Sequence, residues 1–188
     1  QVNDAAYPGA GQTAVLVPDS AGSYQTFTRG GTDTGANWSQ VSPLPPSATS
    51  NLVSTLNVGD AETENLVSAA SAGVRGTINR VKSVLRVGPD DTAGSGKLRS
   101  RAGATVSDFG TAAATSGVDI TLSMVMNTDP ATTLAWTTGG LDALQVGLKE
   151  ASTTDHTSVY GVYAMADFSP PITPVADFSG APLVAVGS

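Results

Sequence analysis

Apolar and polar residues alternate with a period of two along several short stretches of this chain. Such alternation predicts β-strands with one buried side. The clearest cases are residues 77–87, 97–102, 118–126 and 158–168. Weaker cases are residues 24–29, 37–41, 51–56, 62–70 and 145–150. Eight to ten short strands, spaced by roughly ten residues, are typical of a β-sandwich or a jelly roll.

Turn residues separate these stretches. Residues 88–94, Gly-Pro-Asp-Asp-Thr-Ala-Gly, have the composition of a turn, so the strands before and after them are predicted to pair as an antiparallel hairpin. Prolines at 43, 45 and 46 exclude a central strand, because proline has no N–H for a ladder. Thr137 or Thr138 is expected to cap a single helical turn that carries Leu141 and Leu144.

The two ends of the chain differ from its middle. Residues 1–21 are rich in Gly, Ala and Pro and are interpreted as an N-terminal arm or an edge strand, followed by a sandwich over residues 22–168. Residues 169–188 hold four prolines and one charged residue, and are interpreted as a Pro-rich C-terminal arm. Ile172, Val175 and Phe178 would place this arm on a partner; packing on its own domain is the alternative.

Composition supports an all-β fold and limits the chemistry. The 188 residues suit one domain, with 40% apolar and 13% charged residues. The absence of cysteine excludes disulfides, thiolate nucleophiles and Cys-ligated metals. No apolar run is long enough to span a bilayer, so no membrane partner is expected. The formal charge of −7 disfavours nucleic acid, whose binding depends on Lys and Arg.

Candidate catalytic and metal-binding residues are few. His156 is the single histidine and follows Asp155 in a polar loop, and the chain has no Gly-x-Ser-x-Gly elbow. Asp60, Glu62 and Glu64 have strand spacing, which could serve calcium binding or glycoside cleavage, but they lack the register of a calcium loop. We therefore predict no enzyme activity, no cofactor and no metal.

Positive charge is concentrated in the predicted hairpin. Residues 75–101 contain seven Lys and Arg against two Asp, a net of +5, which leaves −12 on the rest of the chain. Six of these cations form two sets, one on each predicted strand: Arg80, Lys82 and Arg86, and Lys97, Arg99 and Arg101. Because side chains alternate along a strand, each set lies on one side of its own strand. We predict a cationic ledge that an acidic partner covers; a solvated outer face is the alternative.

One segment carries a resemblance. Residues 128–137, Thr-Asp-Pro-Ala-Thr-Thr-Leu-Ala-Trp-Thr, followed by Leu-Asp-Ala-Leu-Gln-Val-Gly at 141–147, resemble the closing segment of a family of jelly-roll domains. This family occurs in structural proteins of tailed bacteriophages and in related environmental viral sequences. Asn37-Trp38 and the turn at 88–96 lie where the family has its equivalents, so the resemblance covers residues 13–168. In physical terms, Trp136 is expected to be buried beside Leu134.

The resemblance implies a virion component, such as a head decoration protein, a head fibre or a minor tail protein, without catalytic residues. Together these observations predict an antiparallel β-sandwich of jelly-roll type with one short helical turn and extended terminal arms. The expected function is a non-enzymatic capsid decoration or head-fibre-base protein. Its expected partners are the major capsid protein or neighbouring virion proteins and further copies of itself, as in a trimer. The alternative is a carbohydrate- or receptor-binding module of a tail fibre, which the aromatic content of 5% weighs against.

Overall fold

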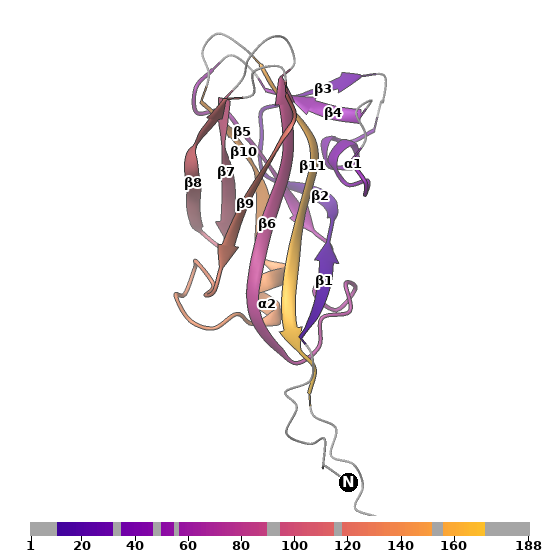
Figure 1. The fold of residues 1–188 in the computed structure, drawn as a ribbon, viewed down its shortest axis with the longest axis vertical. Helices are drawn as coiled ribbons and strands as arrows, with labels where there is room; N and C mark the ends of the chain where they lie inside the picture. The colour runs from indigo at the N-terminus through magenta and orange to yellow at the C-terminus, as the bar shows by residue number, and fades with distance from the viewer. Residues whose placement is uncertain are drawn as a thin grey trace, which may run out of the picture.

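The fold is known from a computed structural model, which describes residues 11–31, 35–46, 50–54, 57–89, 95–114, 118–151 and 156–171. Two antiparallel sheets pack face to face (Figure 1). Sheet A contains β1 (Gln12–Leu16), β3 (Thr28–Gly31), β4 (Ser50–Val53), β6 (Thr77–Pro89), β9 (Ile120–Met126) and β11 (Thr157–Ser169). Sheet B contains β2 (Pro18–Gln25), β5 (Ala61–Leu66), β7 (Ser95–Ala102), β8 (Thr105–Ala114) and β10 (Leu144–Glu150). The two short helices are α1 (Asn37–Val41) and α2 (Thr138–Asp142).

The strand order is that of a jelly roll. Eight consecutive strands pair as a nested series: β4 with β11, β5 with β10, β6 with β9, and β7 with β8. Successive pairs alternate between the sheets, which produces the orders β4-β11-β6-β9 and β5-β10-β7-β8. This arrangement is a long hairpin rolled into two sheets. The predicted all-β, jelly-roll fold class is therefore confirmed.

The predicted hairpin between residues 77–87 and 97–102 is wrong. These residues belong to β6 and β7, which lie in different sheets. β6 pairs with β11 and β9, whereas β7 pairs with β10 and β8. The tight hairpin is instead β7–β8, turning at Gly103 with a φ of 55°. Alternation identified each strand but could not select its partner, because both strands are amphipathic in the same way. Residues 90–94 of the predicted turn lie outside the described residues.

The N-terminal segment is part of the sheets from residue 12 onward. β1 pairs with β11 over Gln12–Leu16, and β2 pairs with β5. The sandwich therefore begins before residue 22, the predicted boundary, because β1 and β2 are edge strands of the two sheets. Residues 172–188 of the C-terminal arm, with Ile172, Val175 and Phe178, lie outside the described residues.

Residues 37–41 form α1 rather than the predicted strand. The helix buries Gln40 and Val41, which have 0% exposure. A five-residue apolar pattern does not distinguish a strand from one helical turn, and packing decides between them.

The core lies between the sheets and includes Trp136, Leu141, Leu144 and Val146 of the 128–147 segment. Trp136 is buried, and its Nε1 donates to the carbonyl oxygen of Met126 at 3.0 Å. Thr137 caps α2 by accepting from the N–H of Gly140 at 3.0 Å, and Leu141 and Leu144 are fully buried. The predicted helical turn is thus confirmed. Leu134, expected beside Trp136, is instead 68% exposed. Among the described residues, no helix has the length and apolar character needed to cross a membrane.

Candidate functional site

The six cations of the predicted ledge lie on opposite faces of the sandwich. On β6, Val81 and Leu85 are buried between the sheets, so Arg80, Lys82 and Arg86 project from the outer face of sheet A. On β7, the buried Leu98 and Ala102 point inward. Lys97, Arg99 and Arg101 therefore project from the outer face of sheet B. A single cationic ledge does not exist, because β6 and β7 belong to different sheets.

On sheet B the cations hold neighbouring strands together. The Nε of Arg99 and its terminal nitrogen bind the two oxygens of Asp108 on β8, at 2.7 and 3.0 Å. The Arg99 guanidinium also lies 4.9 Å from the ring centroid of Tyr24. Arg101 donates to the hydroxyl of Ser23. The Arg99 side chain is 9% exposed, so this cation is a structural contact rather than a free docking group.

The carboxylate of Asp108 also accepts from Lys149 at 3.1 Å. Hydrogen bonding from Arg99 lowers the pKa of Asp108, and Lys149 lowers it further. Asp108 therefore stays ionised and joins β8 to β7 and β10.

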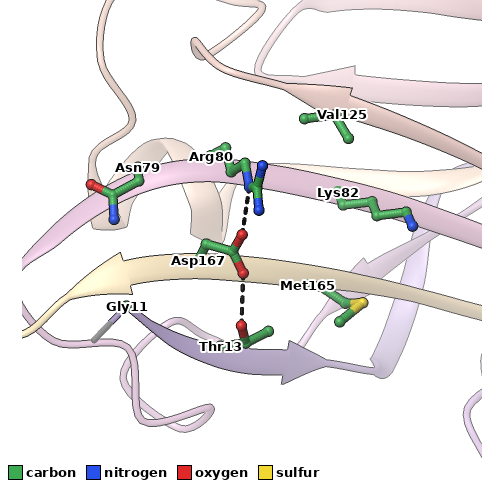
Figure 2. Close-up of a pocket in the computed structure, with 8 residues that line it drawn as sticks. All are labelled: Gly11, Thr13, Asn79, Arg80, Lys82, Val125, Met165 and Asp167. Carbon is green, nitrogen blue, oxygen red and sulfur yellow. Dashed lines mark hydrogen bonds and ion pairs between the residues drawn. The ribbon is translucent and has the colours of Figure 1, made fainter.

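On sheet A, four strands build an open groove of about 820 Å³ (Figure 2). Its lining residues come from β6, β9 and β11 and from β1 with the residue before it. They are Gly11, Thr13, Asn79, Arg80, Lys82, Val125, Met165 and Asp167. The ladders of sheet A align these residues. Met165 is opposite both Lys82 and Val15, Val125 is opposite Lys82, and Asp167 is opposite both Arg80 and Thr13.

Asp167 lies between two donors near the middle of the groove (Figure 2). The hydroxyl of Thr13 donates to one carboxylate oxygen at 2.7 Å, and the Nε of Arg80 binds the other at 2.5 Å. The hydrogen bond from Thr13 and that from Arg80 lower the pKa of Asp167. This carboxylate is therefore ionised at neutral pH and orients Arg80 within the groove, as Figure 2 shows.

Lys82 is the second cation of the groove. Within the described part of the chain, no carboxylate lies at ion-pair distance from its ammonium group. With Arg80 balanced by Asp167, the groove carries an excess of one positive charge. Arg86, further along β6, pairs instead with Asp119 at 2.9 Å.

The sequence analysis selected Arg80 and Lys82 but missed the rest of the groove. Asp167 and Met165 share one side of the alternating stretch 158–168, so their outward direction could be predicted from the sequence. Their position beside Lys82 and Thr13 could not be predicted, because it depends on the pairing of β11 with β1 and β6.

Two acids that the sequence analysis considered for calcium lie in the interior. Glu62 is opposite Leu148 and Glu64 is opposite Val146, so both side chains point between the sheets. Their exposures are 2% and 0%. Glu62 accepts from Asn37 Nδ2 at 2.9 Å and from the N–H of Phe27 at 3.1 Å.

Burial raises the pKa of Glu64 to about 9, and the charge of Glu62 adds to this effect. Burial also raises the pKa of Glu62. Because burial and the neighbouring charge raise the pKa of Glu64 well above neutrality, Glu64 is the protonated partner. Gln25 Nε2 lies 3.4 Å from Glu64. Since N–H donors surround the pair, it fits a shared proton rather than a cation. The described residues contain no group of three acids or histidines placed to hold a metal.

His156 has a structural contact. Its Nδ1 lies 2.5 Å from the carbonyl oxygen of Ser54, next to the start of β11. The preceding Asp155 lies outside the described residues. The ring therefore joins two chain segments at one end of sheet A.

Comparisons with known proteins identify no family. No protein-family model matches the chain, and no curated protein sequence matches it significantly. Solved structures with a similar arrangement include the CBM22-1-CBM22-2 tandem domain of Paenibacillus barcinonensis Xyn10C, at a TM-score of 0.45 and 12% identity over 88% of this chain and 49% of that chain. This chain thus spans about half the length of that tandem domain.

Two further similar structures are covered almost over their whole length. One is the CBM22-1 xylan-binding domain of the same Paenibacillus barcinonensis protein, at a TM-score of 0.43 and 12% identity, covering 85% of this chain and 97% of that chain. The other is the vertex protein P5 of PRD1, at a TM-score of 0.35 and 15% identity, covering 83% of this chain and 96% of that chain.

Proposed function

We propose that this chain is a non-enzymatic structural protein of a phage virion, a capsid decoration or head-fibre-base protein. In this proposal the outer face of sheet A docks on an acidic surface of the major capsid protein or of a neighbouring virion protein. The resemblance of residues 128–147 to phage jelly-roll proteins supports the class of protein. The groove on sheet A supports the docking surface.

The observation that carries the proposal is the state of the charges in the groove. Asp167 is held ionised by Thr13 and Arg80, so it is a poor proton donor. Lys82 offers an ammonium group with no ion-pair partner in the described part of the chain. Such a groove suits the binding of a carboxylate rather than acid–base chemistry.

Charge distribution also favours an oriented approach. The whole chain carries −7, whereas the groove carries an excess of positive charge. An acidic partner is repelled by the net charge of the molecule and attracted at this face. The outer face of sheet B also carries cations, so charge alone does not choose between the two faces, and the groove is the feature that favours sheet A. The groove lies on paired strands, with β6 pairing without interruption to β9 and with two irregularities to β11, so little backbone order is lost on binding.

The experiment compares two matched charge reversals. Lys82→Glu changes the groove, and Lys97→Glu makes the same change on the outer face of sheet B. We expect Lys82→Glu to lower the fraction that co-sediments with phage particles by about tenfold, since it replaces an attraction by a repulsion. Lys97→Glu should co-sediment like the unchanged chain. Equal loss in both variants, or in neither, would contradict the proposed docking face.

A carbohydrate- or receptor-binding role is the second candidate, and the size of the groove favours it. A volume of about 820 Å³ is within the range of small-molecule sites, and Thr13 and Asn79 provide hydrogen-bonding groups. Among the described lining residues there is no aromatic ring to stack on a neutral sugar. Binding to acidic glycans on an array, lost in Lys82→Glu, together with no co-sedimentation, would favour this candidate.

A further inference from the structure

Strand β9 is an unprotected edge of sheet A. It lies at the end of the order β3-β4-β11-β6-β9 (Figure 1), and within the described residues no strand pairs with its free side. Its seven residues, Ile-Thr-Leu-Ser-Met-Val-Met, include no charge and no proline. A strand edge of this kind presents unpaired N–H and C=O groups to any extended segment that approaches it.

The inner side of β9 is also incompletely covered. Ile120, Leu122 and Met124 point toward sheet B but remain partly exposed, unlike the buried residues of β6. Between β9 and sheet B lies a second cavity of about 250 Å³, lined by Leu98, Phe109, Gly110, Leu122, Ser123 and Met124. The sandwich is therefore open along this side, and apolar surface there is available to a partner.

Other edges of the described sandwich lack this combination. At the opposite end of sheet A, β3 has only four residues and carries Arg29. On sheet B, β8 carries the ion-paired Asp108 and a positive φ at Gly110, and its ladder is irregular. β2 contains Pro18 and a break in its pairing with β5. β1 is uncharged, but its inward Ala14 and Leu16 are already buried. Charge, proline and bulges are the features that normally protect an edge strand.

We propose that β9 is the contact of a twofold dimer, in which β9 of one copy pairs antiparallel with β9 of a second copy. The register that pairs all seven residues is centred on Ser123. It places Ile120 opposite Met126 of the second copy and Leu122 opposite Met124, so inward residues meet inward residues. A register shifted by one residue would place inward residues opposite outward ones and is excluded.

The second copy is the favoured occupant because β9 is complementary to itself. No like charges meet across the new ladder, and the outward Thr121 would face Val125 of the second copy. The inward residues of β9 in each copy would also cover part of the open side of the other copy. An interface that uses the same patch twice closes as a dimer and leaves no free β9 edge for further growth. The dimer would place both grooves of sheet A on one continuous face.

The test uses Ser123, which is exposed and outward-facing, so changes there should not disturb the core. Mass measurement in solution by light scattering should give about twice 18.8 kDa for the unchanged chain. Ser123→Lys and Ser123→Glu should each give the single-chain mass, because like charges then meet at the twofold axis. An equal mixture of the two variants should restore the double mass. Val15→Lys, on edge strand β1, is the control and should remain dimeric.

Three results would overturn the proposal. These are a single-chain mass for the unchanged protein, a double mass for both Ser123 variants, or no recovery in the mixture when circular dichroism shows both variants folded. A chain ending at Pro171 separates this contact from one made by the C-terminal segment, because it should remain dimeric. Loss of the dimer on that truncation would assign the occupant to residues 172–188 instead.

Discussion

Replacing Glu64 by glutamine should make the protein more stable at neutral and alkaline pH. Glu64 is fully buried, and the charge of the neighbouring Glu62 acts on it. Because burial and the Glu62 charge raise its pKa to about 9, Glu64 is protonated in the fold at pH 7. In the unfolded chain the same carboxyl is ionised there. Glutamine keeps the size and a donor group toward Glu62 but needs no proton.

The size of the effect follows from proton linkage. The pKa of Glu64 rises from 4.5 to about 9 on folding. For a raised pKa, the favourable contribution is complete below the unfolded pKa and is lost as the pH rises toward the folded pKa. Each pH unit in this window costs about 1.4 kcal/mol, so the loss between about pH 5 and pH 8 is about 4 kcal/mol. Glu64→Gln should not show this loss.

The assay is urea unfolding followed by tryptophan fluorescence at several pH values between about pH 5 and pH 8. The difference in unfolding free energy between Glu64→Gln and the unchanged chain should grow across this range in favour of the variant. Glu62→Gln is the contrasting change. Its carboxylate accepts from Asn37 and from the N–H of Phe27, so an amide nitrogen there would face donors and destabilise the protein at every pH.

Parallel pH profiles for Glu64→Gln and the unchanged chain would refute this reasoning. They would mean that Glu64 is ionised in the folded protein, either by access to water or by a bound cation. A stabilisation by Glu62→Gln equal to that by Glu64→Gln would show that the proton is not localised on Glu64.

Three further predictions concern the core, the sheet contacts and the surface ion pair. Trp136→Ala should cost about 3 to 5 kcal/mol in urea unfolding, whereas a transition like that of the unchanged chain would mean that the ring is exposed. Gly147→Ala should lower the free energy of unfolding by about 3 kcal/mol or more, because the added Cβ would lie 1.8 Å from the carbonyl oxygen of Glu62. The control Gly139→Ala, in α2, should not destabilise the protein. Asp108→Asn should lower the melting temperature at pH 7, and this effect should shrink as the pH falls below the ordinary aspartate value of 3.8, because a lowered pKa contributes stability that is lost as the pH falls through it. An effect that does not change with pH would contradict the ion pair.

The strands were predictable where one side of each strand is buried. Residues 77–87 and 158–168 were identified closely as β6 and β11, and the outward direction of Lys82 and Arg86 was correct. A half-buried strand imposes period-two alternation whichever strand lies beside it. β8 was missed because Thr105–Ala114 consists mostly of small and polar residues, and its inward Thr105, Ser107 and Phe109 are only partly buried.

The candidate site was predictable only as separate residues. Arg80 and Lys82 were selected for their charge, but Asp167 and Thr13 join them through ladders that connect distant parts of the chain. The same limit applies to Glu62 and Glu64. Their alternation placed them on one side of a strand, and only packing showed that this side is the interior.

The sequence by itself determined an all-β chain without thiol chemistry, and it determined which side of β6 and which side of β7 carry the cations. Tertiary structure decided that these strands lie in different sheets, so that the cations separate into a groove on sheet A and a network on sheet B. The physical reason is that the two properties depend on different lengths of the chain. Alternation is a local property of one strand, whereas the choice of partner strand depends on the whole nested set of pairings across the jelly roll.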